Sequence, residues 1–320
     1  MRSCSSARWN TTPTTHELRH CSVTGCYSTA ARCYERAIAL APGDAKLLYE
    51  ADQLASRRGV PVADRLAALE ARRADVLRRD DLALAYSRLL TQAGREDEAI
   101  TLLIRHRFHP WEGGEGVALA AWASAHQAAA RRALSDGRPE EAVSAARAAL
   151  EPPENLGEAP HPLANRAALL LDLGDAFAAV GDGPAARAAW VGAAESAGDF
   201  FLMAPVPYSE ATYASIVAAE RLGRVEDAAR LLEGLRDYIA RLRRTPAEID
   251  YFATSLPTML IFDEDVQQRQ DLLADVLTAQ LALVEGDRTA AGAALGRVLT
   301  ADPAHPEANR LLRQIHAAAG

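Results

Sequence analysis

The sequence predicts an all-α protein, a superhelical solenoid made from copies of one αα-hairpin. Three observations support this fold class. Ala is abundant, and β-branched runs of strand length are nearly absent. Long apolar runs with helical periodicity each end at a Gly. A Gly followed five residues later by an Ala recurs along the chain, as Gly25/Ala30, Gly94/Ala99, Gly137/Ala142, Gly181/Ala186, Gly223/Ala228 and Gly286/Ala291.

The repeated Gly and Ala have distinct physical roles in a helix-turn-helix hairpin. Gly137, for example, follows the first helix at a place where the backbone turns left-handed and a Cβ is unfavourable. Pro139 then suits the first turn of the second helix, as the acidic Glu96 does after Gly94. The small Ala142 lets the second helix pack closely on the first.

The expected helices follow in chain order as first and second helices of successive hairpins. The first complete hairpin is altered, because Ala63 stands near the usual Ala position after Gly59. A helix at 306–318 is expected to close the array. The expected pairs are 47–58 with 61–79, 82–93 with 96–105, 117–136 with 139–150, 163–180 with 184–196, 209–222 with 225–243, and 267–285 with 289–300.

Apolar side chains on the later first helices form stripes too wide for one hairpin to bury. Between residues 267 and 285, Leu273, Val276, Leu277, Leu281 and Val284 fall at helical spacing. Stacking of neighbouring hairpins buries such a stripe, at about 25 cal/mol per Å² of apolar surface. The sequence therefore predicts one continuous core that winds along the array.

Length and charge narrow the class of protein. The 320 residues suit one long repeat array or two ordinary domains. The net charge of −8 argues against a nucleic-acid surface, which needs concentrated positive charge. No apolar run reaches the 18 residues that suggest a membrane span, and no signal-peptide core is evident, so we expect a cytoplasmic protein without membrane contact.

Residues 1–29 differ from the rest, and we expect a poorly ordered or degraded segment before a repeat domain at 30–320. The segment is rich in Ser and Thr and holds Cys4, Cys21 and Cys26. Its His16–His20 stretch matches the zinc-protease pattern His-Glu-x-x-His. A poor helix start precedes that stretch and the Cys spacing does not suit a zinc site, so we predict no metal, no cofactor and no catalytic residue.

A basic stretch lies between residues 57 and 79. Acidic residues interleave with its arginines, which favours a solvated helix face with ion pairs over a docking site for an acidic partner. The arginines are Arg57, Arg58, Arg65, Arg72, Arg73, Arg78 and Arg79.

The repeat resembles the tetratricopeptide repeat over about residues 30–320. Gly25 and Gly59 lie 34 residues apart, which is the period of that family. The resemblance implies a right-handed superhelix whose concave face, lined by first helices, binds a protein segment. The residues that carry it are Gly25, Ala30, Tyr34, Ala37 and Pro42, and again Gly286, Ala291, Leu295, Val298 and Pro303.

Four connections between hairpins are unusually long. In a stack of hairpins such connections emerge on one edge, so we expect them to be neighbours in space. Aromatic and acidic residues gather in three of them. The long connections are 105–116, 151–162, 198–208 and 244–266.

These loops also resemble the repeat region of large bacterial proteins that carry an N-terminal DUF5107 domain. The matching blocks are residues 109–116, residues 153–158, and residues 250–252 together with 262–265. The resemblance implies that this chain is the C-terminal part of such an architecture, without its β-rich domain. We name the predicted contact surface the binding edge, and its candidate residues are His109, Trp111, Glu112, Glu115, Asn155, Glu158, Tyr251, Phe262 and Asp263.

Three interpretations of the binding edge remain open. Large aromatics most often fill gaps between elements, with carboxylates capping helices, and this structural interpretation is favoured. A docking edge for a protein segment or companion domain comes next. A carbohydrate site, with a stacking plane and paired carboxylates, is the third. We therefore expect a non-catalytic scaffold for protein or interdomain contacts, with an accessory role in a carbohydrate-active protein, and a glycan partner, as the alternative.

Overall fold

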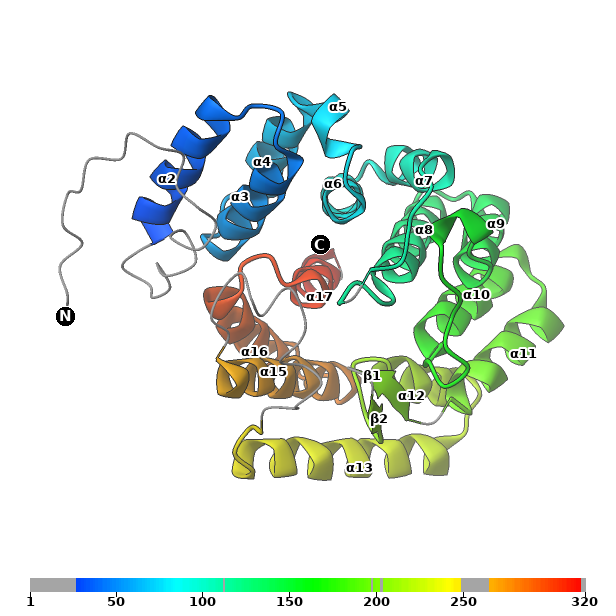
Figure 1. The fold of residues 1–320 in the computed structure, drawn as a ribbon. Coiled ribbons are helices and arrows are strands. Elements are labelled where there is room, and N and C mark those ends of the chain that lie inside the picture. Colours follow the sequence, from blue (N-terminus) through cyan, green and yellow to red (C-terminus); the bar gives the residue numbers. More distant parts are fainter. Residues whose placement is uncertain (1–26, 112, 197, 202–203, 249–264, 318–320) are drawn as a thin grey trace.

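The computed structural model describes residues 27–111, 113–196, 198–201, 204–248 and 265–317 (Figure 1). In the N-terminal half the helices are α2 (Tyr27–Leu40), α3 (Ala45–Arg57), α4 (Val62–Glu70), α5 (Arg73–Val76), α6 (Asp80–Gln92), α7 (Glu96–Arg105), α8 (Val117–Ser135), α9 (Pro139–Leu150) and the 3-10 helix η1 (Glu154–Leu156). In the C-terminal half they are α10 (Ala167–Val180), α11 (Gly183–Ala194), α12 (Thr212–Arg221), α13 (Val225–Arg244), α15 (Val266–Val284), α16 (Arg288–Ala301) and α17 (Pro306–Ala317).

For the described residues, the prediction of an all-α protein is confirmed apart from one short β-hairpin. Strands β1 (Asp199–Phe201) and β2 (Ala204–Val206) pair antiparallel inside the connection predicted at 198–208. Consecutive helices pack against one another along the chain, as the hairpin prediction requires.

The predicted Gly turns are confirmed wherever the structure describes them. Gly137 has a φ of 72°, in the left-handed region, and a side chain there would be strained. Ala142, five residues later, is fully buried where α9 meets α8. The Gly residues with positive φ at hairpin turns are Gly59, Gly94, Gly137, Gly181, Gly223 and Gly286.

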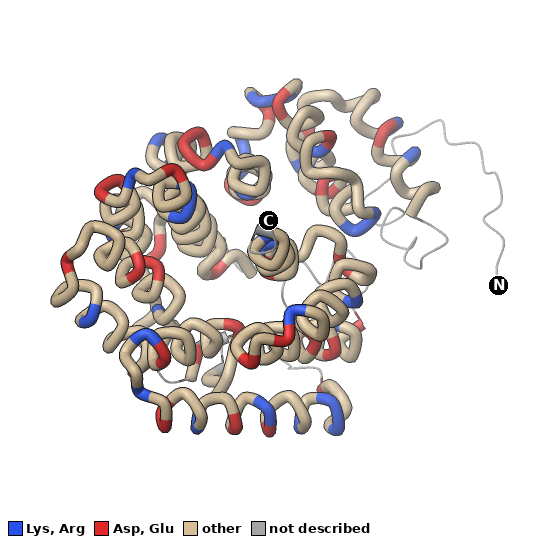
Figure 2. Tube along the Cα trace, turned by 180° about the vertical axis from the view of Figure 1, so that it is seen from behind, with Lys and Arg blue, Asp and Glu red and all other residues tan. Residues whose placement is uncertain are grey.

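The helix pairs follow one another around a centre, and α17 lies at that centre (Figure 1). The view from behind shows the same arrangement (Figure 2). The two ends of the array meet, because a Cβ added to Gly59 would lie 3.1 Å from Cγ of Pro303 in the loop before α17. Parts of the first and last hairpins are therefore in contact although they are far apart in sequence.

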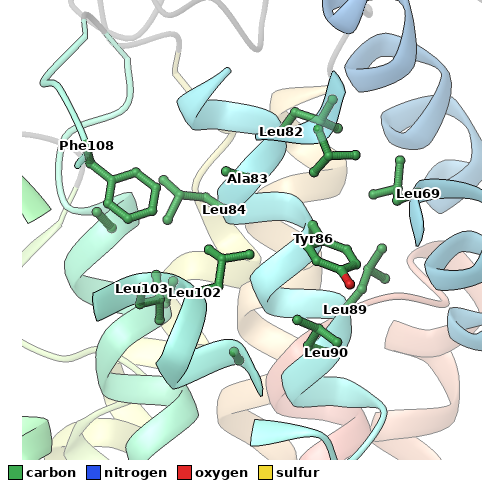
Figure 3. Close-up of a cluster of buried hydrophobic side chains, with 14 of the residues drawn as sticks. Leu69, Leu82, Ala83, Leu84, Tyr86, Leu89, Leu90, Leu102, Leu103 and Phe108 are labelled. Atoms are coloured by element: carbon green, nitrogen blue, oxygen red, sulfur yellow. The ribbon is translucent and has the colours of Figure 1, made fainter. Parts of the chain in front are cut away.

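The largest core cluster surrounds α6 (Figure 3). Eight of the 13 residues of this helix are buried, because α3, α4, α7 and α8 all pack on it. Tyr86 and Leu90 of α6, Leu103 of α7 and Phe108 after α7 are almost completely buried.

Several expected helices have different limits, and two differ most. The helix expected at 61–79 is wrong as one unit, because the backbone leaves helical geometry at Arg72 and gives α4 and α5. Arg72 there donates a hydrogen bond of 2.8 Å to the backbone oxygen of Pro42, while Val76 of α5 enters the core. Helix α10 starts later than expected because the side chain of Asn165 accepts a hydrogen bond from the N–H of Ala167, a local contact that favours a helix start.

One arginine of the basic stretch, Arg65, is buried instead of solvated as expected. Arg65 and Asp52 are buried and form two hydrogen bonds of 2.8 and 2.7 Å between α4 and α3. Arg78 reaches the backbone oxygen of Gly43 at 3.3 Å. These arginines tie neighbouring elements together.

Candidate functional site

The first two long connections lie against each other, as the sequence predicts. The side-chain amide of Asn155 donates hydrogen bonds to the backbone oxygens of Leu103 and His106, at 2.7 and 2.6 Å. The N–H of Phe108 donates to the backbone oxygen of Asn155 at 2.8 Å. Gly157 has a φ of 77° and its Cα lies so close to Phe108 that a Cβ would be 2.6 Å from that residue's oxygen.

Glu158, in the second long connection, caps α8, the helix that follows the first long connection. Its carboxylate accepts hydrogen bonds from the N–H groups of Gly116, Ala118 and Leu119, at 2.6, 3.1 and 3.3 Å. These are free N–H groups at the start of α8, where the helix dipole also favours a negative charge. Glu158 therefore has a structural role at the binding edge.

The second and third connections also touch. Asn165 donates a hydrogen bond of 2.7 Å from its side chain to the backbone oxygen of Gly198, and its N–H donates to Asp199 at 3.0 Å. For these three connections the predicted clustering is confirmed. Most of the fourth connection lies outside the described residues.

A hollow of about 380 Å³ opens between the first two connections. The indole of Trp111 forms one wall and lies directly over Gly114, where an added Cβ would be 2.0 Å from Cε2 of the ring. Behind it, Trp111 contacts the large core cluster. The residues that line the hollow are His109, Pro110, Trp111, Gly114, Glu115, Ala118, Leu156 and Glu158.

Asp80, the first residue of α6, holds in place the 105–116 connection, which forms one side of the hollow. Its carboxylate lies 2.7 Å from Nε2 of His106 and 3.1 Å from Nδ1 of His109, and it accepts a hydrogen bond of 2.8 Å from the N–H of His109. Burial acts to raise the pKa of Asp80, but the hydrogen bonds from His106 and His109 hold it below its ordinary value. The His109 side chain remains largely exposed on the rim.

The predicted binding edge is therefore only partly brought together. Asn155 and Glu158 are occupied by backbone contacts, and His109, Trp111, the exposed Glu115 and Glu158 itself line the hollow. Four predicted residues, Glu112, Tyr251, Phe262 and Asp263, lie outside the described residues, and so does the His16–His20 stretch.

A second group of polar residues, which we name the inner cluster, was not predicted from the sequence. On one side, Arg131 and Gln127 of α8 donate hydrogen bonds to the carboxylate of Asp172 on α10, at 2.8 and 2.7 Å for the shorter contacts. On the other, Arg310 of α17 donates two hydrogen bonds of 2.6 Å to Glu307. The two sides are close enough for charge interactions between Arg310 and Asp172 and between Arg131 and Glu307.

Gln280 of α15 joins α17 to the entry of α12 within this cluster. Its amide nitrogen donates hydrogen bonds of 3.1 Å to the carboxylate of Glu307 and to the backbone oxygen of Glu210. Burial raises the pKa of Glu210 to about 7, with a further rise from the nearby charge of Glu307. Burial also raises the pKa of Asp172.

Sequence spacing gave no signal for the inner cluster, because its members come from distant helices and meet only when the array curves round. Among the described residues no group of His, Cys, Asp and Glu could hold a metal ion. Within the same residues, no helix is long and apolar enough to cross a membrane. No protein-family model matches the chain, so its function has to be inferred from this geometry.

Proposed function

We propose that the protein is a non-catalytic tetratricopeptide-like scaffold of the cytoplasm, with a right-handed superhelical array that binds a protein segment or companion domain. The left-handed Gly turns, the buried Ala at the fifth position and the packing of consecutive helices support the array. Such arrays expose long surfaces suited to extended partners.

The observation that carries the binding role is the prearranged hollow at the binding edge. Asn155 and Glu158 hold its backbone in place by hydrogen bonds that link the two connections to each other and to the start of α8. Trp111 gives it an apolar wall, while His109 and Glu115 give it a polar rim. A buried aromatic anchor with a polar rim is typical of protein-binding hot spots, and a fixed backbone lowers the entropy lost on binding.

The alternative is an accessory part of a carbohydrate-active protein whose β-rich domain is separate from this chain. The indole of Trp111 beside Glu115 is the feature that favours it. Glu158 does not suit a catalytic acid or base, because both of its carboxylate oxygens already accept N–H groups of α8. This engagement favours the scaffold.

Affinity enrichment from a bacterial lysate tests the proposal. The wild-type chain and Val225→Ala, an exposed change at the start of α13 away from the hollow, are expected to capture the same protein. Trp111→Ala is expected to lose it, and calorimetry with the purified partner is expected to show at least a tenfold weaker association. Equal capture by all three chains contradicts the proposal. Glycan-array binding that depends on Trp111, with no captured protein, supports the alternative.

A further inference from the structure

Two histidines of the 105–116 connection share one carboxylate, and we name this group of Asp80, His106 and His109 the histidine clasp. Oδ1 of Asp80 lies 2.7 Å from Nε2 of His106, and Oδ2 lies 3.1 Å from Nδ1 of His109. Oδ2 also accepts a hydrogen bond of 2.8 Å from the N–H of His109. One side chain at the start of α6 therefore holds the connection at two of its residues.

The clasp can exchange protons with water, although its inner part is shielded. The side chains of Asp80 and His106 are 19% and 17% exposed, whereas that of His109 is 73% exposed. The ring of His106 also packs on Phe108, with 4.5 Å between the two ring centroids. A change of charge at the contact between Asp80 and His106 is therefore less screened than at a fully exposed pair.

The other charged groups around the clasp are engaged elsewhere or exposed. Asp81, the next residue of α6, accepts two hydrogen bonds from Arg79, at 3.0 and 2.6 Å. Across the hollow, the carboxylate of Glu158 accepts N–H groups of α8. The exposed charges on the connection and at the end of α7 are Arg105, Arg107 and Glu115. The strength of the clasp therefore depends chiefly on the protons of its own two histidines.

Protonation of these histidines changes the strength of the clasp. A histidine ordinarily gains a proton as the pH falls through about 6.5. A neutral ring offers Asp80 an ordinary hydrogen bond, whereas an imidazolium offers a charge-assisted one of roughly twice the strength. Burial acts to raise the pKa of Asp80, but the hydrogen bonds from His106 and His109 hold it below its ordinary value, so the carboxylate stays charged above about pH 4.

We propose that the histidine clasp is a pH-sensitive device that holds the 105–116 connection, and with it one wall of the hollow, more firmly below about pH 6.5 than above it. His109 lines the hollow beside Trp111, whose indole forms that wall. A wall that is held more firmly loses less entropy on binding, so a partner at the hollow binds more tightly in mild acid. This consequence for a partner rests on the proposed function, whereas the clasp itself does not.

Amide hydrogen exchange of the full chain, measured by NMR at pH 5.5 and pH 8 without a partner, tests the clasp. The quantity compared is the protection factor of the His109 N–H that donates to Asp80, which is corrected for the intrinsic effect of pH on exchange. We expect it to be at least about fivefold larger at pH 5.5, because an imidazolium strengthens the contacts that hold this N–H in place. The Asp287 N–H, which donates to the backbone oxygen of Ala282 in the turn between α15 and α16, should be equally protected at both pH values.

Three variants separate the charge of the clasp from its structural role. In Asp80→Asn, which keeps an acceptor oxygen and loses the charge, we expect the two protection factors to agree within about twofold, whatever their absolute size. His106→Gln, which leaves only the exposed His109, is expected to lower the ratio. His316→Gln, an exposed change on α17, should keep the wild-type ratio.

Thermal melting checks that all three variants are folded. Equal protection of the His109 N–H in the wild type at both pH values, or a wild-type ratio retained by folded Asp80→Asn, overturns the proposal. Failure to capture a partner contradicts the scaffold function alone, because the exchange measurement uses no partner.

Discussion

The carboxylate of Glu158 accepts a hydrogen bond of 2.6 Å from the N–H of Gly116, although the two residues are 42 positions apart. Through this contact the 151–162 connection, which follows α9, caps α8, the helix that follows the 105–116 connection. It fixes both connections in one arrangement and so shapes the hollow at the binding edge.

Removal of this cap is expected to destabilise the protein. Glu158→Ala leaves three N–H groups of α8 without their charged acceptor, and we expect the free energy of unfolding to fall by about 2 kcal/mol. Urea denaturation measures the change. The matched control is Glu154→Ala, an exposed acid on η1, for which we expect less than about 0.5 kcal/mol. Similar losses for both variants would show that the cap has no special role.

A methyl group at Gly174 is expected to be unfavourable. An added Cβ would lie 2.4 Å from Cδ1 of Trp190, where α10 packs on α11, so Gly174→Ala forces the indole or the helix to move. We expect a loss of about 1–3 kcal/mol in urea denaturation. Gly296→Ala on α16 is the control, because no atom lies within 4 Å of its added Cβ; there we expect a gain of up to about 1 kcal/mol from helix propensity. A stable Gly174→Ala protein would contradict this packing.

The buried pair between Arg65 and Asp52 is expected to be sensitive to loss of one partner. Asp52→Asn leaves the guanidinium buried without its countercharge, so we expect a loss of about 3 kcal/mol or more, measured by urea denaturation. Glu141→Gln removes one partner of the exposed pair with Arg138 and is expected to change stability by less than about 0.5 kcal/mol. An equally small effect of Asp52→Asn would mean that Arg65 finds water in the folded state.

His126 is expected to make stability fall in acid. Burial lowers the pKa of this histidine to about 4 from the usual 6.5, and neither ring nitrogen has a partner within the described residues. At a pH between the two pKa values, the unfolded chain therefore binds more protons than the folded protein. The stability that the neutral His126 contributes is complete above about pH 6.5 and is lost as the pH falls toward about 4. Denaturation at pH 7.5 and pH 5 is expected to show a smaller acid loss for His126→Leu than for the wild type. His316→Leu, an exposed change, should behave like the wild type.

Glu210 is expected to act in the opposite direction. The pKa of Glu210 in the folded protein is about 7, above the usual 4.5, so the folded state holds a proton that the unfolded chain has already lost. The charged groups around it are Glu307 and Arg310 of α17, with Asp172 and Arg131 beyond them. Stability from this residue is complete below about pH 4.5 and is lost as the pH rises through 7. Glu210→Gln is expected to flatten that part of the profile, measured by thermal melting from pH 4.5 to 8. A wild-type slope retained in the variant would assign the effect to another group.

Several parts of the binding edge could be predicted, and others could not. Loop length and the stacking rule were enough to expect the first three long connections side by side. The individual roles were not predictable: Glu158 looks like a surface acid in sequence, and only its distance to the start of α8 shows that it is a cap. The helix break at Arg72 is similar, because a contact with Pro42 and the burial of Val76 override a continuous helical pattern.

The sequence by itself determined the hairpins, because left-handed Gly turns, small Ala contacts and 3.6-residue apolar periodicity are local properties of the chain. It also determined that the first three long connections lie close together, because stacked hairpins place them on one edge. The tertiary structure alone decided that the ends of the array meet and that α8, α10, α15, α17 and the residues just before α12 bring the inner cluster together. Small rotations between successive hairpins add up to that curvature, and no local pattern of residues records their sum.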